Sequence, residues 1–231
     1  MKNKINNQYT IKIILVGDST VGKTSLFNYV FNIKTENYLQ TIGIDNGQKN
    51  IKVKVNEKEY DVSLKMVDTA GQERFHSLSK TYFKKADGVL FMYDVTKKET
   101  FININKWLSN MKEATSTEEI FCGIIGNKID LIGIKYYNEK NEREEIYDNE
   151  VNSEELKNFQ EQLIEDDLRV EVKEISAKTG ENVDEFLNTF INKILEYKLN
   201  NNQLKEKKSS RFITLQNPKK LKTNKKCCRS K

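Results

Sequence analysis

The chain has 231 residues, of which 37% are hydrophobic and 32% charged, with a formal net charge of +5. This apolar content is sufficient for one buried core and excludes a chain too polar to fold. The chain has no apolar run of about 20 residues, so no membrane span is predicted. Its polar start, MKNKINNQYT, lacks the apolar core of a signal peptide. We therefore expect synthesis in the cytosol.

The N-terminal part predicts a strand, a phosphate-binding loop and a helix. YTIKIILV has the composition of a buried strand, GDSTVGKT fits G-x-x-x-x-G-K-[ST], and TSLFNYVF opens a helix. In such loops, glycines let backbone N–H groups surround phosphate, a lysine adds charge and a hydroxyl binds Mg²⁺, while the helix N-terminus favours an anion. These roles fall to Gly17, Gly22, Lys23 and Thr24. Alone, the motif is also compatible with a flexible glycine turn.

A second apolar stretch, VSLKMV, ends at the string DTAGQE. Asp68 stands where a nucleotide site needs a carboxylate for Mg²⁺. Gly71 allows a backbone N–H to approach the γ-phosphate, and Gln72 is able to orient an attacking water because its amide both donates and accepts. Alone, DTAG is equally compatible with an ordinary turn at a strand end.

Two later strings, NKID and SAK, follow the strand IFCGIIG and the strand-like stretch RVEVKEI. Asn127 and Asp130 are therefore expected at the carboxyl edge of a parallel sheet, where such folds bind ligands. The Asp130 carboxylate would select guanine, because it would accept from the N1–H and the 2-amino group of guanine, and adenine has neither. We expect the Ala177 N–H at the guanine oxygen and the Lys178 stem on the ring face.

Helices are predicted from apolar stripes. Residues 182–198 carry a stripe that marks packing, and SEELKNFQEQLIEDD predicts another helix. Phe101, Ile104, Leu108 and Met111 mark a third, with Trp107 beside that stripe as a packing residue. Because strands and helices alternate, we expect a mostly parallel sheet.

In their order and spacing, the four strings resemble those of the Ras superfamily of small GTPases, and within it the Rab family, over about residues 9–198. TIGID resembles switch I, DTAGQERF resembles switch II, and YDVT and KWL recur in the same places. The resemblance implies an α/β fold, the P-loop NTPase small G domain. Its mostly parallel six-stranded sheet would have helices on both faces, with a short N-terminal extension (1–8) before it and a disordered basic tail (199–231) after it.

The resemblance also implies GTP or GDP with Mg²⁺ as ligands. Thr41 would join Thr24 and Asp68 at Mg²⁺ in the GTP state, and Gln72 would be the catalytic residue. Without an arginine supplied by an activating protein, hydrolysis is expected to be slow. The implied nucleotide-binding positions are Gly17, Asp18, Ser19, Thr20, Val21, Gly22, Lys23, Thr24, Ser25, Thr41, Asp68, Gly71, Asn127, Lys128, Asp130, Ser176, Ala177 and Lys178.

Some positions depart from the family pattern. Lys34 replaces the aromatic that many relatives place against the guanine edge, with Phe31 or Ile33 as candidate substitutes. Asn46 and Val67 replace two aromatics on which Rab effectors pack, so familiar effectors do not carry over. The alternative function that these departures favour is a GTP-binding scaffold that cycles slowly or not at all.

An insertion at about residues 132–152, containing IGIKYYNEKNEREEIYDNEVN, lacks helical or strand periodicity. Loops of this length are usually functional or disordered. We expect disorder, with a docking loop built on Tyr136, Tyr137 and Tyr147 as the alternative. Deletion of residues 134–150 should leave GTP binding intact.

The positive charge lies in the tail, since residues 200–231 contain 11 Lys and Arg against one Glu. Alone, this composition fits a solvated tail, a nucleic-acid arm or a membrane-surface segment. Cys122 is expected to be buried, whereas the adjacent Cys227 and Cys228 resemble the paired cysteines that carry two geranylgeranyl groups in Rabs. The apolar Phe212, Ile213 and Leu215 resemble the element through which Rab tails meet escort proteins.

The family resemblance implies a set of partners and a location. The partners are a guanine nucleotide exchange factor, a GTPase-activating protein, a GDP dissociation inhibitor or escort protein, and effectors. A nucleic-acid or nuclear-transport role is disfavoured because Ran-type chains end acidic and lack terminal cysteines, so no nucleic acid is expected. We expect a monomer on the cytoplasmic face of intracellular membranes, anchored by lipid and cycling with the cytosol.

Overall fold

The computed structural model describes residues 9–33, 44–69, 83, 85–115, 120–138 and 143–215. The chain divides into two compact units, Met1–Leu195 and Glu196–Lys231. The sheet and the described nucleotide motifs belong to the first unit.

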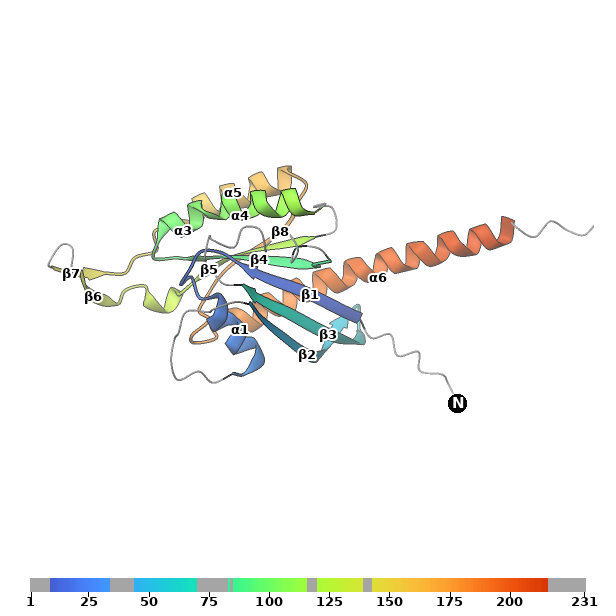
Figure 1. The fold of residues 1–231 in the computed structure, drawn as a ribbon, viewed down its shortest axis with the longest axis horizontal. Helices are drawn as coiled ribbons and strands as arrows, with labels where there is room; N and C mark the ends of the chain where they lie inside the picture. Colours follow the sequence, from blue (N-terminus) through green and yellow to red (C-terminus); the bar gives the residue numbers. More distant parts are fainter. Residues whose placement is uncertain are drawn as a thin grey trace, which may run out of the picture. The chain divides into compact units, whose positions relative to one another are not determined.

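Six strands form one sheet in the order β2-β3-β1-β4-β5-β8 (Figure 1). Neighbouring strands pair in parallel except β2 and β3, which are antiparallel. The prediction of a mostly parallel six-stranded sheet is confirmed. The strands are β1 (Tyr9–Val16), β2 (Ile44–Val55), β3 (Lys58–Thr69), β4 (Gly88–Asp94), β5 (Phe121–Asn127) and β8 (Arg169–Ile175).

Helices cover both faces of this sheet (Figure 1). On one face lie α3 (Lys98–Ile102), α4 (Ile104–Ala114) and α5 (Ser153–Glu165). On the other lie α1 (Lys23–Phe31) and the first turns of α6 (Val183–Leu215). This arrangement confirms the predicted fold class.

The core is centred on β4 and β5, in which every residue is buried. Central parallel strands with both faces covered are expected to be continuously apolar in this way. Between the sheet and the helices, Phe101 lies edge-on to Tyr93 and to Phe159, with ring centroids 5.0 and 5.2 Å apart. These rings hold α3 and α5 together over β4.

Two helices differ in extent from the prediction. The helix expected through Phe101 and Met111 is two helices, because α3 ends at Ile102 and α4 begins at Ile104. The helix expected over 182–198 begins at Val183 and continues to Leu215. The start of α5 is fixed by a capping box, in which the Asn152 side chain accepts from the Glu155 N–H and the Glu155 carboxylate from the Asn152 N–H.

The insertion contains a hairpin, so the expectation of disorder is wrong for its described residues. Outside the main sheet, β6 (Lys135–Asn138) pairs antiparallel with β7 (Arg143–Ile146). The rings of Tyr136 and Tyr147 stack at 4.0 Å, and the Glu145 carboxylate accepts from the Tyr136 hydroxyl. Four-residue strands place only two side chains on each face, too few for a visible alternation, and these cross-strand contacts supply the stability.

Candidate guanine nucleotide site

The loop between β1 and α1 has the shape that its glycines predict. Gly17 and Gly22 have φ values of 142° and 100°, which L side chains rarely adopt. A Cβ at Gly17 would lie 2.2 Å from the Met92 carbonyl oxygen, and one at Gly22 would lie 2.1 Å from Asn127 Nδ2. Both positions therefore need glycine for backbone conformation and for space.

Lys23 is buried beneath this loop, with 5% of its surface exposed. Its Nζ donates to the carbonyl oxygens of Gly17 and Asp18, at 2.9 and 2.7 Å. Burial lowers the pKa of Lys23 to about 8, although the nearby carboxylates of Asp68 and Asp18 act in the opposite direction. A phosphate in the loop would supply the negative charge that this buried ammonium group needs.

Thr24 and Asp68 meet at the end of β3. The Thr24 hydroxyl donates to Asp68 Oδ2 at 2.6 Å, and Asp68 is fully buried. Burial raises the pKa of Asp68, opposed by the Thr24 hydrogen bond and by Lys23. Among the described residues, Asp68 Oδ1 has no hydrogen-bond partner. A hydroxyl beside a buried carboxylate with a spare oxygen fits Mg²⁺, which prefers oxygen ligands, so Thr24 and Asp68 are the described residues placed to hold this ion.

Asn127, the last residue of β5, joins three of the sequence motifs. Its Nδ2 donates to the Val21 carbonyl at 2.8 Å, and its Oδ1 accepts from the Ala177 N–H at 2.9 Å. One buried amide thus fixes the phosphate loop and the SAK loop to the NKID motif, across sequence separations of 106 and 50 residues.

Asp130 lies against the SAK loop as well. Its Oδ1 accepts from the Ser176 hydroxyl at 2.6 Å, and Lys178 Nζ lies 3.9 Å from its Oδ2. Ser176 Oγ in turn accepts from the Thr179 N–H at 3.1 Å. The carboxylate expected to select guanine is therefore oriented by the loop expected to contact the same base.

Lys128 and Asp94 form an ion pair that sequence reasoning missed. Lys128 adopts a left-handed conformation, and its Nζ lies 2.6 Å from Asp94 Oδ2. The Asp94 carboxylate is buried and also accepts from the N–H and hydroxyl of Thr96. The string YDVT, which resembles the family pattern, pointed to Asp94, but nothing in the string shows that this aspartate pairs with Lys128.

Tyr29 of α1 is another contact that the motifs did not indicate. Gly180, with a φ of 86°, approaches this ring so closely that a Cβ there would lie 2.6 Å from it. The Tyr29 hydroxyl donates to Asp184 at 3.1 Å. This contact supports the SAK loop from the side of α1.

Among the remaining loop positions, Val21 is buried, Ser19 and Ser25 are half-buried, and Thr20 is exposed with a φ of 66°. Both carboxylate oxygens of Asp18 are bound, one by Asn103 and the other by Trp107, so Trp107 has a polar contact beyond the packing role predicted for it. Thr41, Gly71, Gln72, Lys34, Cys227 and Cys228 lie outside the described residues.

Of the two candidate substitutes for the missing aromatic, Phe31 is committed to packing within the domain. Its ring lies 4.7 Å from that of Phe27, and a Cβ at Gly47 of β2 would lie 2.4 Å from it. Ile33 is about half exposed. Of these two candidates, Ile33 therefore keeps an exposed apolar side chain near the end of α1.

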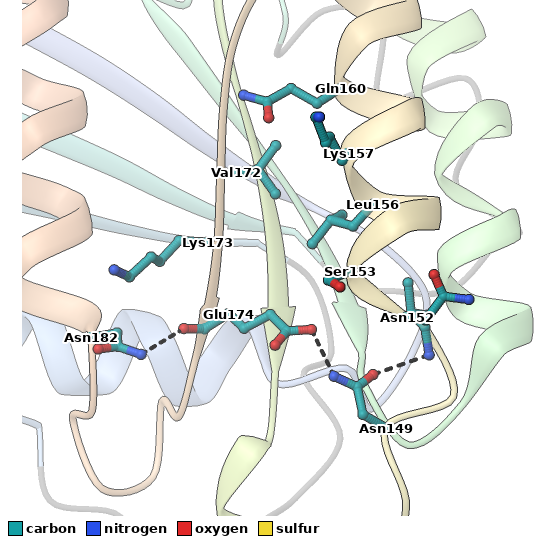
Figure 2. A pocket seen from close by; sticks show the side chains of 11 residues that line it. Asn149, Asn152, Ser153, Leu156, Lys157, Gln160, Val172, Lys173, Glu174 and Asn182 are labelled. Atoms are coloured by element: carbon teal, nitrogen blue, oxygen red, sulfur yellow. Dashed lines mark hydrogen bonds between the residues drawn. The ribbon is translucent and has the colours of Figure 1, made fainter.

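A separate surface pocket of about 500 Å³ lies between α5 and β8 (Figure 2). Asn149 Nδ2 donates to Glu174 Oε1, and Asn182 Nδ2 donates to the Glu174 carbonyl. None of the predicted nucleotide-site residues that the structure describes lines this pocket. It is distinct from the loops around Asn127.

The chain matches the family model described as Ras family over residues 12–196. It is 32% identical to Ras-related protein Rab-27B of Homo sapiens over 195 residues, with 81% of each chain covered. It is 35% identical to GTP-binding protein ypt2 of Schizosaccharomyces pombe over 195 residues, covering 83% of this chain and 84% of the relative. Ras-related protein Rab-11C of Dictyostelium discoideum is 38% identical over 125 residues, 54% of each chain.

Proposed function

The chain belongs to the Ras family and is a Rab-like small GTPase, and from this premise we propose that it is a GTP/GDP switch that regulates vesicle trafficking at intracellular membranes. Binding of a guanine nucleotide is supported above all by Asn127, whose side-chain amide joins the phosphate loop to the SAK loop. Asp130, oriented by Ser176, is placed to accept from guanine. Both contacts support a site for a guanine nucleotide.

The proposed reaction is hydrolysis of GTP to GDP and phosphate. Lys23 and the backbone of residues 17–25 would bind the phosphates, and Thr24 and Asp68 would hold Mg²⁺, which would supply positive charge to the phosphate oxygens. Gln72 would orient the attacking water, and Thr41 would join Thr24 and Asp68 in holding Mg²⁺ in the GTP state. Without an arginine in trans, hydrolysis runs at roughly 10⁻⁴ s⁻¹ and gains about 10⁵-fold from an activating protein.

We further propose that the protein is anchored to the cytoplasmic face of a membrane by lipid. Geranylgeranyl groups on Cys227 and Cys228 give stable anchoring, since one chain is marginal and two are not. The basic residues of the tail add attraction to anionic lipid. Across the helices that the structure describes, none has the length and apolar character to span a bilayer.

The proposed partners are an exchange factor, an activating protein, a GDP dissociation inhibitor or escort protein, and effectors. Asn46 and Val67 are directly opposite each other in the β2–β3 ladder, so the two departures from the effector-binding pattern form one place on the sheet. Asn46 is exposed, whereas Val67 is buried. Effectors of this chain should therefore read a smaller and more polar surface there than an aromatic pair presents.

The test is GTP hydrolysis by the purified chain, compared with Gln72→Leu, with nucleotide release followed in parallel. We expect slow hydrolysis that the substitution abolishes, and acceleration by a GTPase-activating protein. Tight GTP binding without turnover, even beside the activating protein, would instead favour the non-cycling scaffold. Failure of the wild type to bind guanine nucleotide would contradict both.

A further inference from the structure

The side chain of Asp18, in the phosphate loop, is bound by the start of α4. Asn103 Nδ2 donates to Asp18 Oδ2 at 2.7 Å, and Trp107 Nε1 donates to Asp18 Oδ1 at 3.0 Å. Asn103 and Trp107 are four residues apart, so both side chains lie on the same face of the helix. The two carboxylate oxygens are thus each held by a different donor from α4.

Asn103 makes this contact in place of a local one. It occupies the N-cap of α4, where an asparagine side chain commonly accepts from the first turn of its own helix. Here no such side-chain bond is formed, and the amide reaches a residue 85 positions away instead. The Asn103 side chain therefore binds the phosphate loop, while its backbone carbonyl accepts from the first turn of α4.

Asp18 also connects this contact to Lys23. The Asp18 carbonyl oxygen accepts from Lys23 Nζ at 2.7 Å, while its carboxylate is held by α4. The residues that follow, Ser19 and Thr20, have no glycine freedom, and Thr20 adopts a φ of 66°. Because its side chain is held by α4, Asp18 fixes the position from which Ser19 and Thr20 continue the loop.

We propose that Asn103 and Trp107 are positioning residues of the nucleotide site, which hold the phosphate loop in its binding shape through the Asp18 carboxylate. This inference rests on the proposed function and deepens it, because it makes nucleotide retention depend on α4. Neither residue touches the nucleotide in this proposal. Both act through Asp18.

The test exchanges the donor and the acceptor of the hydrogen bond between Asn103 and Asp18. Asn103→Asp places a second carboxylate against Asp18, and we expect fluorescent GDP (N-methylanthraniloyl-GDP) to dissociate about tenfold faster or more. In the double variant Asn103→Asp with Asp18→Asn, the new amide donates to the new carboxylate and its oxygen still accepts from Trp107. We expect its dissociation rate to return to within about threefold of wild type.

Asn105→Asp is the matched control, because Asn105 is exposed on the same helix and its side chain donates to the Ile102 carbonyl, a local contact. It should leave the rate unchanged. Trp107→Phe keeps an aromatic ring but removes the indole N–H, and should raise the dissociation rate about threefold. This variant keeps the proposal testable if Asn103→Asp does not fold.

Trp107 also supplies a spectroscopic readout, since it is the only tryptophan of the chain. Its emission should change when GDP is released, because its N–H partner lies in the phosphate loop. Unchanged emission on release, a wild-type rate in both Asn103→Asp and Trp107→Phe, or failure of the double variant to recover would each overturn the proposal. Absence of GDP binding by the wild type would overturn the proposed function as well, which separates the two failures.

Discussion

Two segments that are neighbours in sequence are held in opposite ways. Asn127 and Asp130 contact Val21, Ser176 and Ala177, which are far away along the chain. The β6–β7 hairpin that follows is held mainly by its own cross-strand contacts, such as the Tyr136–Tyr147 stack. The first segment is a junction of the domain, whereas the second is a self-contained extension of it.

Exposure divides the two segments in the same way. Asn127 is 2% exposed, whereas Tyr137 and Ile146 of the hairpin are 62% and 51% exposed. A change at the junction leaves buried polar groups without partners, and a change in the hairpin mostly alters surface. We therefore expect the two segments to differ both in the reactivity of a thiol placed in them and in how much a substitution weakens nucleotide binding.

The largest difference is expected in thiol reactivity. Burial raises the pKa of Cys122, in β5 behind the junction, to about 12. Because the thiolate is the nucleophile, a pKa raised by about three units leaves roughly a thousandth of the reactive form at neutral pH. The comparison is made in a Cys227→Ser, Cys228→Ser background, where a second variant carries Cys122→Ala and Tyr137→Cys. Iodoacetamide should alkylate Cys122 about a thousandfold more slowly than the thiol introduced into the hairpin of the second variant.

The raised pKa of Cys122 also fixes the direction in which its alkylation rate changes with pH. Native alkylation of Cys122 should rise about tenfold per pH unit from pH 7 to 9, since its thiol is almost wholly protonated there. In urea it should react as an ordinary thiol. Rapid alkylation under native conditions would show that β5 opens readily and would break the contrast with the hairpin.

Removal of the junction amide should have the next largest effect. Asn127→Ala leaves the Val21 carbonyl and the Ala177 N–H without this partner, at a cost of about 1–3 kcal/mol for each. Since 1.4 kcal/mol is a factor of about ten, we expect GDP affinity to fall about a hundredfold. Titration with fluorescent GDP measures this fall.

The matched control makes the same change in the hairpin. Asn138 Nδ2 donates to the Glu145 carboxylate, a contact within the extension. Asn138→Ala should leave GDP affinity within about twofold of wild type. Equal losses in both variants would contradict the distinction between junction and extension.

A smaller effect is expected where one hydroxyl orients the guanine-selecting carboxylate. Ser176→Ala removes the bond to Asp130 Oδ1 and the acceptor for the Thr179 N–H. Both contacts are only partly buried, so water can replace them and the two losses together correspond to about 1 kcal/mol; GDP affinity should fall about fivefold. Ser109→Ala, at an exposed position of α4, is the control; an unchanged affinity in Ser176→Ala would mean that Asp130 needs no help from the SAK loop.

Much of the sheet was predictable, because several strands are apolar runs and RVEVKEI alternates apolar with charged residues. RVEVKEI was predicted as a strand and is β8 (Arg169–Ile175), and YTIKIILV is β1 (Tyr9–Val16). The hairpin was not predictable in this way, because each of its strands has four residues and pairs charged with apolar side chains, as at Lys135 and Ile146. Short strands carry too little pattern to distinguish them from a polar loop.

The site divides similarly between what motifs specify and what only packing specifies. The strings around Lys23, Asn127 and Asp130 predicted which residue types gather at the carboxyl edge, and the described ones do gather there. The contacts of Asp18 with Asn103 and Trp107 were hidden, because they depend on how α4 packs beside the loop. No local pattern encodes a contact across 85 residues.

The smallest effect is expected from removal of the hairpin itself. Tyr147 N–H donates to the Ile134 carbonyl, and Gly133 N–H donates to the Tyr147 carbonyl, so the chain already closes at the base of the hairpin. Replacing residues 135–146 with Asn-Gly leaves a two-residue turn that suits this geometry. The design keeps Glu150, whose N–H donates to the Val95 carbonyl.

GDP affinity and GTP hydrolysis of this variant should stay within about twofold of wild type. The reason is that no described contact of β6 or β7 reaches Asn127, Asp130 or the SAK loop. A tenfold loss of affinity would show that the hairpin supports the junction and would remove the contrast between them. If nucleotide binding is retained while binding to a cellular partner is lost, the extension is a docking element. The sequence of the insertion is then determined by contacts with that partner rather than with the nucleotide.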